Sequence, residues 1–362
     1  MRLDSLPSLN QIRNWNLPKL GSKLTGDSGR MYMICDGRTT PWYMGLAKDL
    51  DQKNSFTVFQ PATWEGMGSE ALEINFKRFE NGERVSKIFR DSKHIWRIID
   101  TIQPASKYDP PRQICGPFRL PLSDARVERL FTRREVKSIM KDILVALQEI
   151  ESKGFVYADL STEDILLSKD QPPEPTEVFA QLWAKEQLSL PFCMHELDGD
   201  FKESYRAPEI FFGKPCSFPA HIWSWGIILT HLLESRTSWM RNDWEELWVG
   251  TMLDNWRKGW EDSHYDDWGC WRHDFLLLDR EMVGDFGIKD CEYFADCELP
   301  DRKLLPFETG DWKEHLLNKG LRDDDVCFLD WVLDPNPETR PTSEQIMKSG
   351  FLEWNEEDSL PA

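Results

Sequence analysis

The sequence has 362 residues, of which 40% are hydrophobic and 30% charged, and this balance is ordinary for a globular protein with a sizeable core. Its net charge of −19 disfavours binding to nucleic acid or to an anionic membrane surface, because both require a positively charged face. A basic protein partner suits this charge better, although an acidic excess often serves solubility alone.

Nothing in the chain predicts export or membrane insertion. The eight cysteines lack metal-ligand spacing, and we find no secretory signal, so we expect a reducing compartment, the cytoplasm or the nucleus. The longest apolar run, from Ile222 to Leu233, is too short to span a bilayer and predicts a buried helix instead.

The first part of the chain is dominated by short strand patterns. Residues 1–29 mix polar residues with Pro and Gly without a period, so we expect an N-terminal extension. Apolar runs at 30–35 and 42–47 flank a turn, and 55–60 predicts a third strand. The next predicted segments are a helix at 69–90, a strand at 95–99 and a Pro-rich loop at 101–114.

Helical periodicity takes over in the second part. From Arg134 to Ile150, apolar residues recur on one helix face, and Gly154 closes this helix. The rest is mostly helical apart from a Pro-rich interruption at 171–175. Because strands precede helices, the predicted class is α+β with segregated lobes.

Four segments carry a family resemblance. Tyr157 to Leu167 is similar to the protein-kinase catalytic loop, H-R-D-L-x-x-x-x-N followed by an apolar strand. Ser204 to Glu209 matches the A-P-E motif of Ser/Thr kinases. Pro219 to Gly226 resembles the start of the large buried helix that follows it, and Leu333 to Thr342 resembles the late segment whose Arg pairs with the A-P-E Glu. The chain therefore resembles a eukaryotic protein kinase over most of its length.

The resemblance implies a bilobal fold with a small β-rich N-lobe and a larger helical C-lobe. We expect an N-terminal extension before residue 30 and a tail after residue 352. The predicted segments are 1–29 for the extension, 30–352 for the kinase-like domain, 30–117 for the N-lobe, 118–352 for the C-lobe and 353–362 for the tail. The stretch from Tyr205 to Gly226 looks most like fungal SR-protein kinases. Seven tryptophans between Trp239 and Trp271 stand where that group carries an insert, and we expect them to pack structurally.

Phosphoryl transfer depends on positioned charges, and the catalytic loop retains only part of the family set. The resemblance implies that Asp159 accepts the proton of a substrate hydroxyl. Asp164 replaces the metal-binding Asn and remains a competent oxygen ligand for Mg²⁺. Ser161 replaces the Lys that contacts the transferring phosphoryl group, a loss that we expect to cost about 10²-fold or more in rate.

The predicted nucleotide site departs further from the family. Aligning the third strand with V-A-I-K places Gln60 at the lysine position, and the family spacing places Glu83 at its helix partner position. A hydrogen bond between Gln60 and Glu83 is then possible, but Gln60 brings no cation to the phosphates. Gly37 matches the first glycine of the nucleotide-covering loop, whereas Arg38 to Pro41 supplies no second glycine.

The metal-binding D-F-G motif is the main gap. Gly284 to Gly287 contains D-F-G but follows A-P-E, so we interpret it as a coincidence in a C-lobe loop. The best candidate in the correct order is Asp198, although only eleven positions separate it from Glu209.

Three further positions concern regulation and architecture. Ala158 replaces the Arg that grips a phosphorylated activation loop, so switching by loop phosphorylation is not expected. His221 replaces the Asp that braces the catalytic loop. Glu209 and Arg340 are both present, and the resemblance predicts that they form a buried pair.

Three functions remain open from the sequence. The first is a pseudokinase that binds or scaffolds protein partners with weak or no phosphoryl transfer. The second is a divergent Ser/Thr kinase that uses Asp159 as base and ATP with Mg²⁺ on Asp164 and Asp198. It needs another cation near the phosphates, for which Arg38 and Lys48 are candidates. The third is an ATP-binding protein without transfer activity.

Overall fold

The computed structural model describes most of the chain in two compact units. Unit 1 comprises Met1–Leu120, Leu166–Asp170 and Gln181–Leu188, and the remaining residues form unit 2. The structure describes residues 19–36, 44–49, 55–61, 69–106, 109–117, 119–128, 130–157, 160–168, 180–183, 188–189, 205–234, 286–299 and 312–353.

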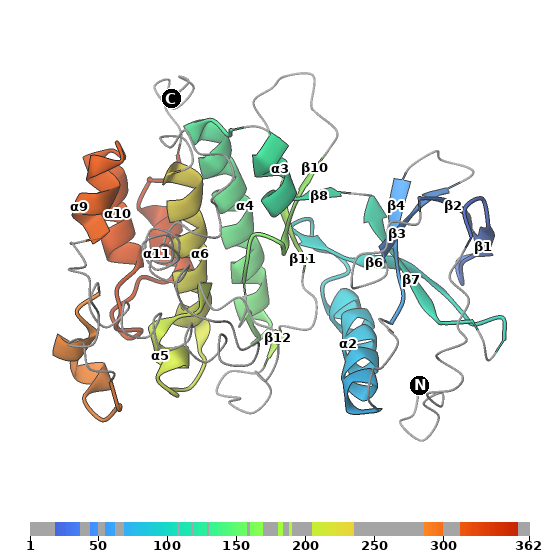
Figure 1. Cartoon of the computed structure of the whole chain (residues 1–362), viewed down its shortest axis with the longest axis horizontal. Helices are drawn as coiled ribbons and strands as arrows, with labels where there is room; N and C mark the ends of the chain where they lie inside the picture. The colour runs from blue at the N-terminus through green and yellow to red at the C-terminus, as the bar shows by residue number, and fades with distance from the viewer. Residues whose placement is uncertain are drawn as a thin grey trace, which may run out of the picture. The chain divides into compact units, whose positions relative to one another are not determined.

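Unit 1 is built on a six-stranded antiparallel sheet with the strand order β1-β2-β3-β4-β7-β6 (Figure 1). Its strands are β1 (Lys23–Thr25), β2 (Met31–Asp36), β3 (Met44–Asp49), β4 (Ser55–Phe59), β6 (Ile98–Ile102) and β7 (Arg112–Pro117). Helix α2 (Ser69–Ile88) belongs to the same unit and lies against β6. The strands predicted at 30–35, 42–47 and 55–60 and the helix predicted at 69–90 are thus confirmed within two residues.

A second, four-stranded sheet has the order β5-β11-β10-β8. It consists of β5 (Ile95–Trp96), β8 (Arg119–Pro121), β10 (Ile165–Ser168) and β11 (Ala180–Trp183). Most of its residues belong to unit 1, to which β10 and β11 return from later in the chain. This return brings Leu166 of β10 into a buried cluster with Phe59 of β4, Trp96 of β5 and Cys115 of β7.

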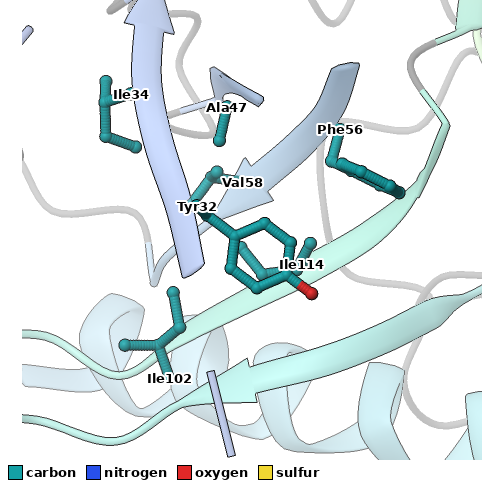
Figure 2. Close-up of a cluster of buried hydrophobic side chains, with 7 residues drawn as sticks. All are labelled: Tyr32, Ile34, Ala47, Phe56, Val58, Ile102 and Ile114. Carbon is teal, nitrogen blue, oxygen red and sulfur yellow. The ribbon is translucent and has the colours of Figure 1, made fainter. Parts of the chain in front are cut away.

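The large sheet encloses an apolar core, which Figure 2 shows in close-up. Five of its strands contribute side chains that are fully or nearly fully buried: Tyr32, Ile34, Ala47, Phe56, Val58, Ile102 and Ile114. The Tyr32 and Phe56 rings meet edge to face with centroids 5.9 Å apart, an arrangement that aromatic quadrupoles favour.

The sheet curls back on itself through Asp100 of β6. The turn between β1 and β2 reaches β6, at the other end of the strand order, where the Asp27 N–H donates to the Thr101 carbonyl oxygen at 2.7 Å. Asp100 accepts from the Ser28 N–H at 3.0 Å and from the Tyr32 hydroxyl at 2.9 Å. A Cβ at Gly26 would lie 2.0 Å from an Asp100 carboxylate oxygen, so only glycine allows this approach.

Two sequence expectations are wrong in this unit. The sheet begins at β1, so the expected boundary at residue 30 falls inside it; β1 has only three residues, too few for a visible period. The segment 101–114 is not a loop throughout, because β6 extends to Ile102 and β7 starts at Arg112. Its prolines lie in the connection between these strands, where they do not interrupt the ladder.

Unit 2 is mostly helical. Its helices are α3 (Leu122–Glu128), α4 (Arg133–Ser152), α5 (Pro208–Phe211), α6 (Phe218–Glu234), α9 (Trp312–Asn318), α10 (Asp323–Val332) and α11 (Ser343–Lys348), with short 3₁₀ turns η4 (Ile288–Asp290) and η5 (Glu292–Phe294). The strand β9 (Val156–Tyr157) follows α4, and β12 (Leu188–Ser189) lies where the chain passes between the units.

Helices α4 and α6 form the centre of unit 2. Thr132 and Glu135 make a capping box that starts α4, and Gly154, with a φ of 77°, follows its end as predicted. Helix α6 is buried along almost its whole length, and its Trp225 indole donates to the Met140 carbonyl oxygen of α4 at 2.9 Å. Within the part of the chain that the structure describes, no helix is long and apolar enough to cross a membrane.

The closure at Asp100 predicts a loss of stability at alkaline pH. Burial, and then the hydrogen bond to Asp100, raise the pKa of Tyr32 to about 12 from an ordinary value of 10. The protonated phenol therefore stabilises the fold fully below pH 10, and this stabilisation disappears as the pH rises toward 12. Denaturant unfolding between pH 8 and pH 12 should show this decline. The Tyr32→Phe variant should lack the part of this decline that comes from ionisation of Tyr32. An unchanged decline in the variant would contradict the assignment of the alkaline loss to Tyr32.

Candidate functional site

Several predicted site residues lie outside the described part of the chain. Asp159, the candidate base, falls between β9 and β10, and Gly37 falls between β2 and β3. Asp198, the tryptophan-rich stretch, Ala158 and Arg38 are also outside the described residues. Their roles stay predictions. Gln60, Glu83, Ser161, Asp164 and His221 are described.

The side chain of β4 that faces α2 at the end of the strand is Phe59. Phe59 is paired with Gln113 in the ladder, and Gln113 donates to the Phe79 carbonyl oxygen of α2 at 2.8 Å. Directly paired residues of antiparallel strands project from the same face of a sheet, so Phe59 and Gln113 share the face toward α2. A cation on β4 that is to reach α2 would have to stand at this position.

Phe59 belongs to an apolar cluster on that face. It packs with Trp96, Cys115 and Leu166, which are all buried. The Phe59 and Trp96 rings meet edge to face with centroids 6.0 Å apart. Thr57, two residues earlier on the same face, is also buried and uncharged. The α2-facing side of β4 over these positions therefore carries no positive charge.

Gln60 and Glu83 are not brought together, so their expected hydrogen bond is not formed. Gln60 follows Phe59 and lies on the opposite face, where its Oε1 accepts from the Arg112 Nε at 3.3 Å. Glu83 instead binds Lys87 one helical turn later at 2.7 Å; the Lys87 side chain is largely exposed and that of Glu83 is partly exposed. A shift of one residue exchanges the two faces of a strand, and this shift displaces Gln60 from the α2-facing position.

In the catalytic loop, Ser161 turns toward Asp164. The Ser161 N–H and hydroxyl donate to the same Asp164 oxygen, Oδ2, at 2.9 and 2.8 Å. The Asp164 N–H donates back to the Ser161 carbonyl oxygen at 3.2 Å. Both side chains are buried. One oxygen of the predicted metal ligand is therefore engaged in closing the loop, and the serine that replaces the family lysine serves the same turn.

Glu209 and Arg340 form the predicted buried pair. The two guanidinium nitrogens Nη1 and Nη2 bind the two carboxylate oxygens at 2.8 and 2.9 Å, and both side chains are completely buried. The remaining N–H groups of Arg340 donate to the carbonyl oxygens of Asp334, Pro219 and Pro335. All five donors of the guanidinium are thus used, which offsets the cost of burying the charge.

The surroundings of Glu209 keep a neighbouring cysteine protonated. Burial, and then the negative charge of Glu209, raise the pKa of the Cys216 thiol to about 12. A thiol with this pKa is a poor nucleophile at neutral pH. Cys216 is therefore a packing residue of the A-P-E region.

His221 makes a different contact from the family's aspartate. Its Nε2 lies 2.7 Å from Glu151 Oε1 at the end of α4, and the other Glu151 oxygen accepts from the Ser343 hydroxyl at 3.0 Å. The histidine thereby connects α6 with α4 and α11. The side chain at this position is oriented toward the helical core of unit 2.

Phe286, from the D-F-G sequence that follows A-P-E, packs in the interior of unit 2. Its ring lies 4.6 Å from that of Trp223 in α6 and 5.4 Å from that of Trp312 in α9. Gly287 has a φ of 64° and starts η4. These contacts fit the interpretation of this sequence as a loop with a packing role.

The described residues do not provide the usual set of groups for ATP with Mg²⁺. The described part of the chain holds no cluster of three or more carboxylate, histidine or cysteine side chains arranged for a metal ion. The position on β4 that faces α2 holds Phe59, and an Asp164 oxygen is engaged by Ser161.

Comparison with known proteins identifies the family. The model of the protein kinase domain matches residues 84–352, which is well over half of the chain. The chain therefore belongs to the protein kinase family. This match begins within α2, after β4.

Individual relatives are distant. The cAMP-dependent protein kinase type 3 of Saccharomyces cerevisiae is 23% identical over 214 residues, which cover 59% of this chain and 47% of that protein. A putative ribosomal protein S6 kinase alpha-1 of Caenorhabditis elegans is 30% identical over 118 residues, which cover 32% of this chain and 14% of that protein. The serine/threonine-protein kinase ATG1a of Arabidopsis thaliana is 27% identical over 131 residues, which cover 35% of this chain and 20% of that protein. The chain matches less than half the length of each of these proteins. The expected resemblance to fungal kinases related to the SR-protein kinases stays a prediction.

The buried pair predicts a large and specific effect on stability. Glu209→Gln leaves the Arg340 charge buried without its counter-ion and should lower the free energy of unfolding by roughly 3–5 kcal/mol. The matched control is Glu344→Gln, which breaks the exposed Glu344–Lys348 pair and should leave the free energy of unfolding nearly unchanged. Denaturant unfolding measures both. Equal losses in the two variants would refute the proposed role of the pair.

Proposed function

We propose that this protein is a pseudokinase, a kinase-fold module that binds protein partners with weak or no phosphoryl transfer. The observation that carries the proposal is the position of Phe59. In protein kinases the third strand carries the V-A-I-K motif. The lysine of this motif holds the α- and β-phosphates and pairs with a helix glutamate. The α2-facing position at the end of β4 holds an aromatic ring that is buried among Trp96, Cys115 and Leu166.

The catalytic loop supports the same proposal. A lysine at position 161 would extend a positive charge toward the transferring phosphoryl group, whereas Ser161 binds Asp164 within the loop. Losing one such electrostatic contact typically costs about 10²–10³-fold in rate. With a second cation missing from β4, the combined losses leave little transfer activity, even if Asp159 occupies the position of the base.

The partner that we propose is a protein with a basic binding segment. Protein kinases recognise other proteins, and the net charge of −19 favours approach by a positively charged surface. The same charge opposes nucleic acid and anionic membranes as partners. The cytoplasm or the nucleus is the compartment that fits this proposal.

Nucleotide binding provides the first test. The melting temperature of the purified protein should not change on addition of ATP, with or without Mg²⁺. A ligand present at a hundredfold over its dissociation constant would stabilise the fold by about 2.7 kcal/mol, a shift that thermal unfolding detects readily.

Two outcomes would change the proposal in different ways. A clear ATP-dependent shift without phosphoryl transfer would indicate an ATP-binding protein. Incorporation of labelled phosphate that disappears in Asp159→Asn would establish the alternative, a divergent Ser/Thr protein kinase that uses Asp159 as its base.

A charge placed on β4 tests the assignment of its two faces. Gln60→Lys would place a second cation beside buried Arg112, so we expect a loss of about 1–3 kcal/mol and no gain in ATP-dependent stabilisation. The matched control Gln60→Glu offers Arg112 a carboxylate and should retain stability. If Gln60→Lys instead created an ATP-dependent rise in melting temperature, the α2-facing role of Phe59 would be refuted.

A further inference from the structure

Helix α2 is tied to the sheet of unit 1 by uncharged hydrogen bonds. The Gln113 amide of β7 donates to the Phe79 carbonyl oxygen at 2.8 Å. The Ser86 hydroxyl donates to the Ile98 carbonyl oxygen of β6 at 3.0 Å and accepts from the Ile98 N–H at 2.9 Å. Three neutral hydrogen bonds thus join one helix to two strands.

These contacts lie on one helical face and are backed by apolar packing. Phe79, Gly82 and Ser86 are spaced three and four residues apart, which places them along one side of an α-helix. A Cβ at Gly82 would lie 3.7 Å from Gln113 and 3.8 Å from Ile98, the two strand residues that bind Phe79 and Ser86. The helix also contributes the buried residues Phe76 and Val85, and Phe89 follows its end.

The three hydrogen bonds that join α2 to β6 and β7 involve no charged group. Glu83, where the resemblance places the helix partner of the lysine, is bound to Lys87 on the same helix at 2.7 Å. Lys87 is largely exposed and Glu83 partly exposed, and both belong to α2, so this pair contributes little to docking. In active protein kinases the Lys–Glu pair must be in place, and the position of the helix is under regulatory control. Here neutral groups hold the helix without that pair.

We infer that α2 is permanently docked on β6 and β7, and that this chain does not use the position of the helix as a switch. These three hydrogen bonds require neither bound nucleotide nor phosphorylation, because their donors and acceptors belong to unit 1 and carry no charge. A helix fixed in this way presents a constant surface to a partner. The inference is independent of transfer activity, because a docked helix is compatible with either an active or an inactive site.

Hydrogen exchange of the full chain, read by mass spectrometry over the peptides of α2, tests this directly. Exchange should differ by less than about twofold between protein alone and protein with ATP and Mg²⁺. It should also be unchanged between about 10 mM and about 1 M NaCl, a range that screens exposed ion pairs but not neutral hydrogen bonds. Slowing of α2 exchange by more than about fivefold with ATP and Mg²⁺, or comparable acceleration by salt, would overturn the inference.

Two neighbouring substitutions separate the neutral contacts from the charged pair. Ser86→Ala removes both hydrogen bonds between α2 and Ile98 and should accelerate exchange in α2 by about tenfold. Lys87→Gln breaks the Glu83 pair on the same helix and should leave exchange unchanged. An equal effect of the two substitutions would show that charge holds the helix. If Ser86→Ala does not fold, the nucleotide and salt comparisons on the unmodified protein still decide the question.

Discussion

The buried charge of Arg340 sets the strongest constraint on unit 2. A guanidinium with no exposed surface is stable only if its counter-ion and its hydrogen-bond acceptors are all in place. Arg340 finds them on Glu209 of α5, on Pro219 at the start of α6 and on the turn from Asp334 to Pro335. One side chain therefore ties the turn from Asp334 to Pro335 to Glu209 and Pro219, which lie 131 and 121 residues before Arg340 in the sequence. Because this requirement is architectural, the pair can persist whether or not the protein transfers phosphate.

Unit 1 shows the opposite solution to the same electrostatic problem. A lysine in place of Phe59 would be surrounded by Trp96, Cys115 and Leu166, and Glu83 is already paired elsewhere. Burying an ammonium without a counter-ion costs several kcal/mol unless bound phosphates compensate for it. An aromatic ring removes this cost and adds packing with Trp96. The substitution is thus favourable for a chain that does not hold nucleotide and unfavourable for one that does.

How much could be predicted from the sequence depended on whether a pattern was local. The periodicity and cap of α4 follow from nearby residues and are confirmed. The Glu209–Arg340 pair joins residues 131 apart in the sequence, and its prediction, also confirmed, came from the family motifs. The face of β4 could not be predicted, because four of its five residues are buried and alternation gives no direction. The turn that follows the three residues of β1 is held by Asp100 through Ser28, 72 residues earlier in the chain, and no local pattern reveals this contact.

A common physical change links these departures from the family pattern. Where the resemblance predicts a group directed at nucleotide or metal, the described structure shows a contact within the protein. Ser161 binds Asp164, Glu83 binds Lys87, and Gln60 binds Arg112. Each of these contacts gives a polar group a partner within the protein in place of a ligand. These internal contacts support the proposed pseudokinase, because they engage the groups that the resemblance directs at nucleotide and metal.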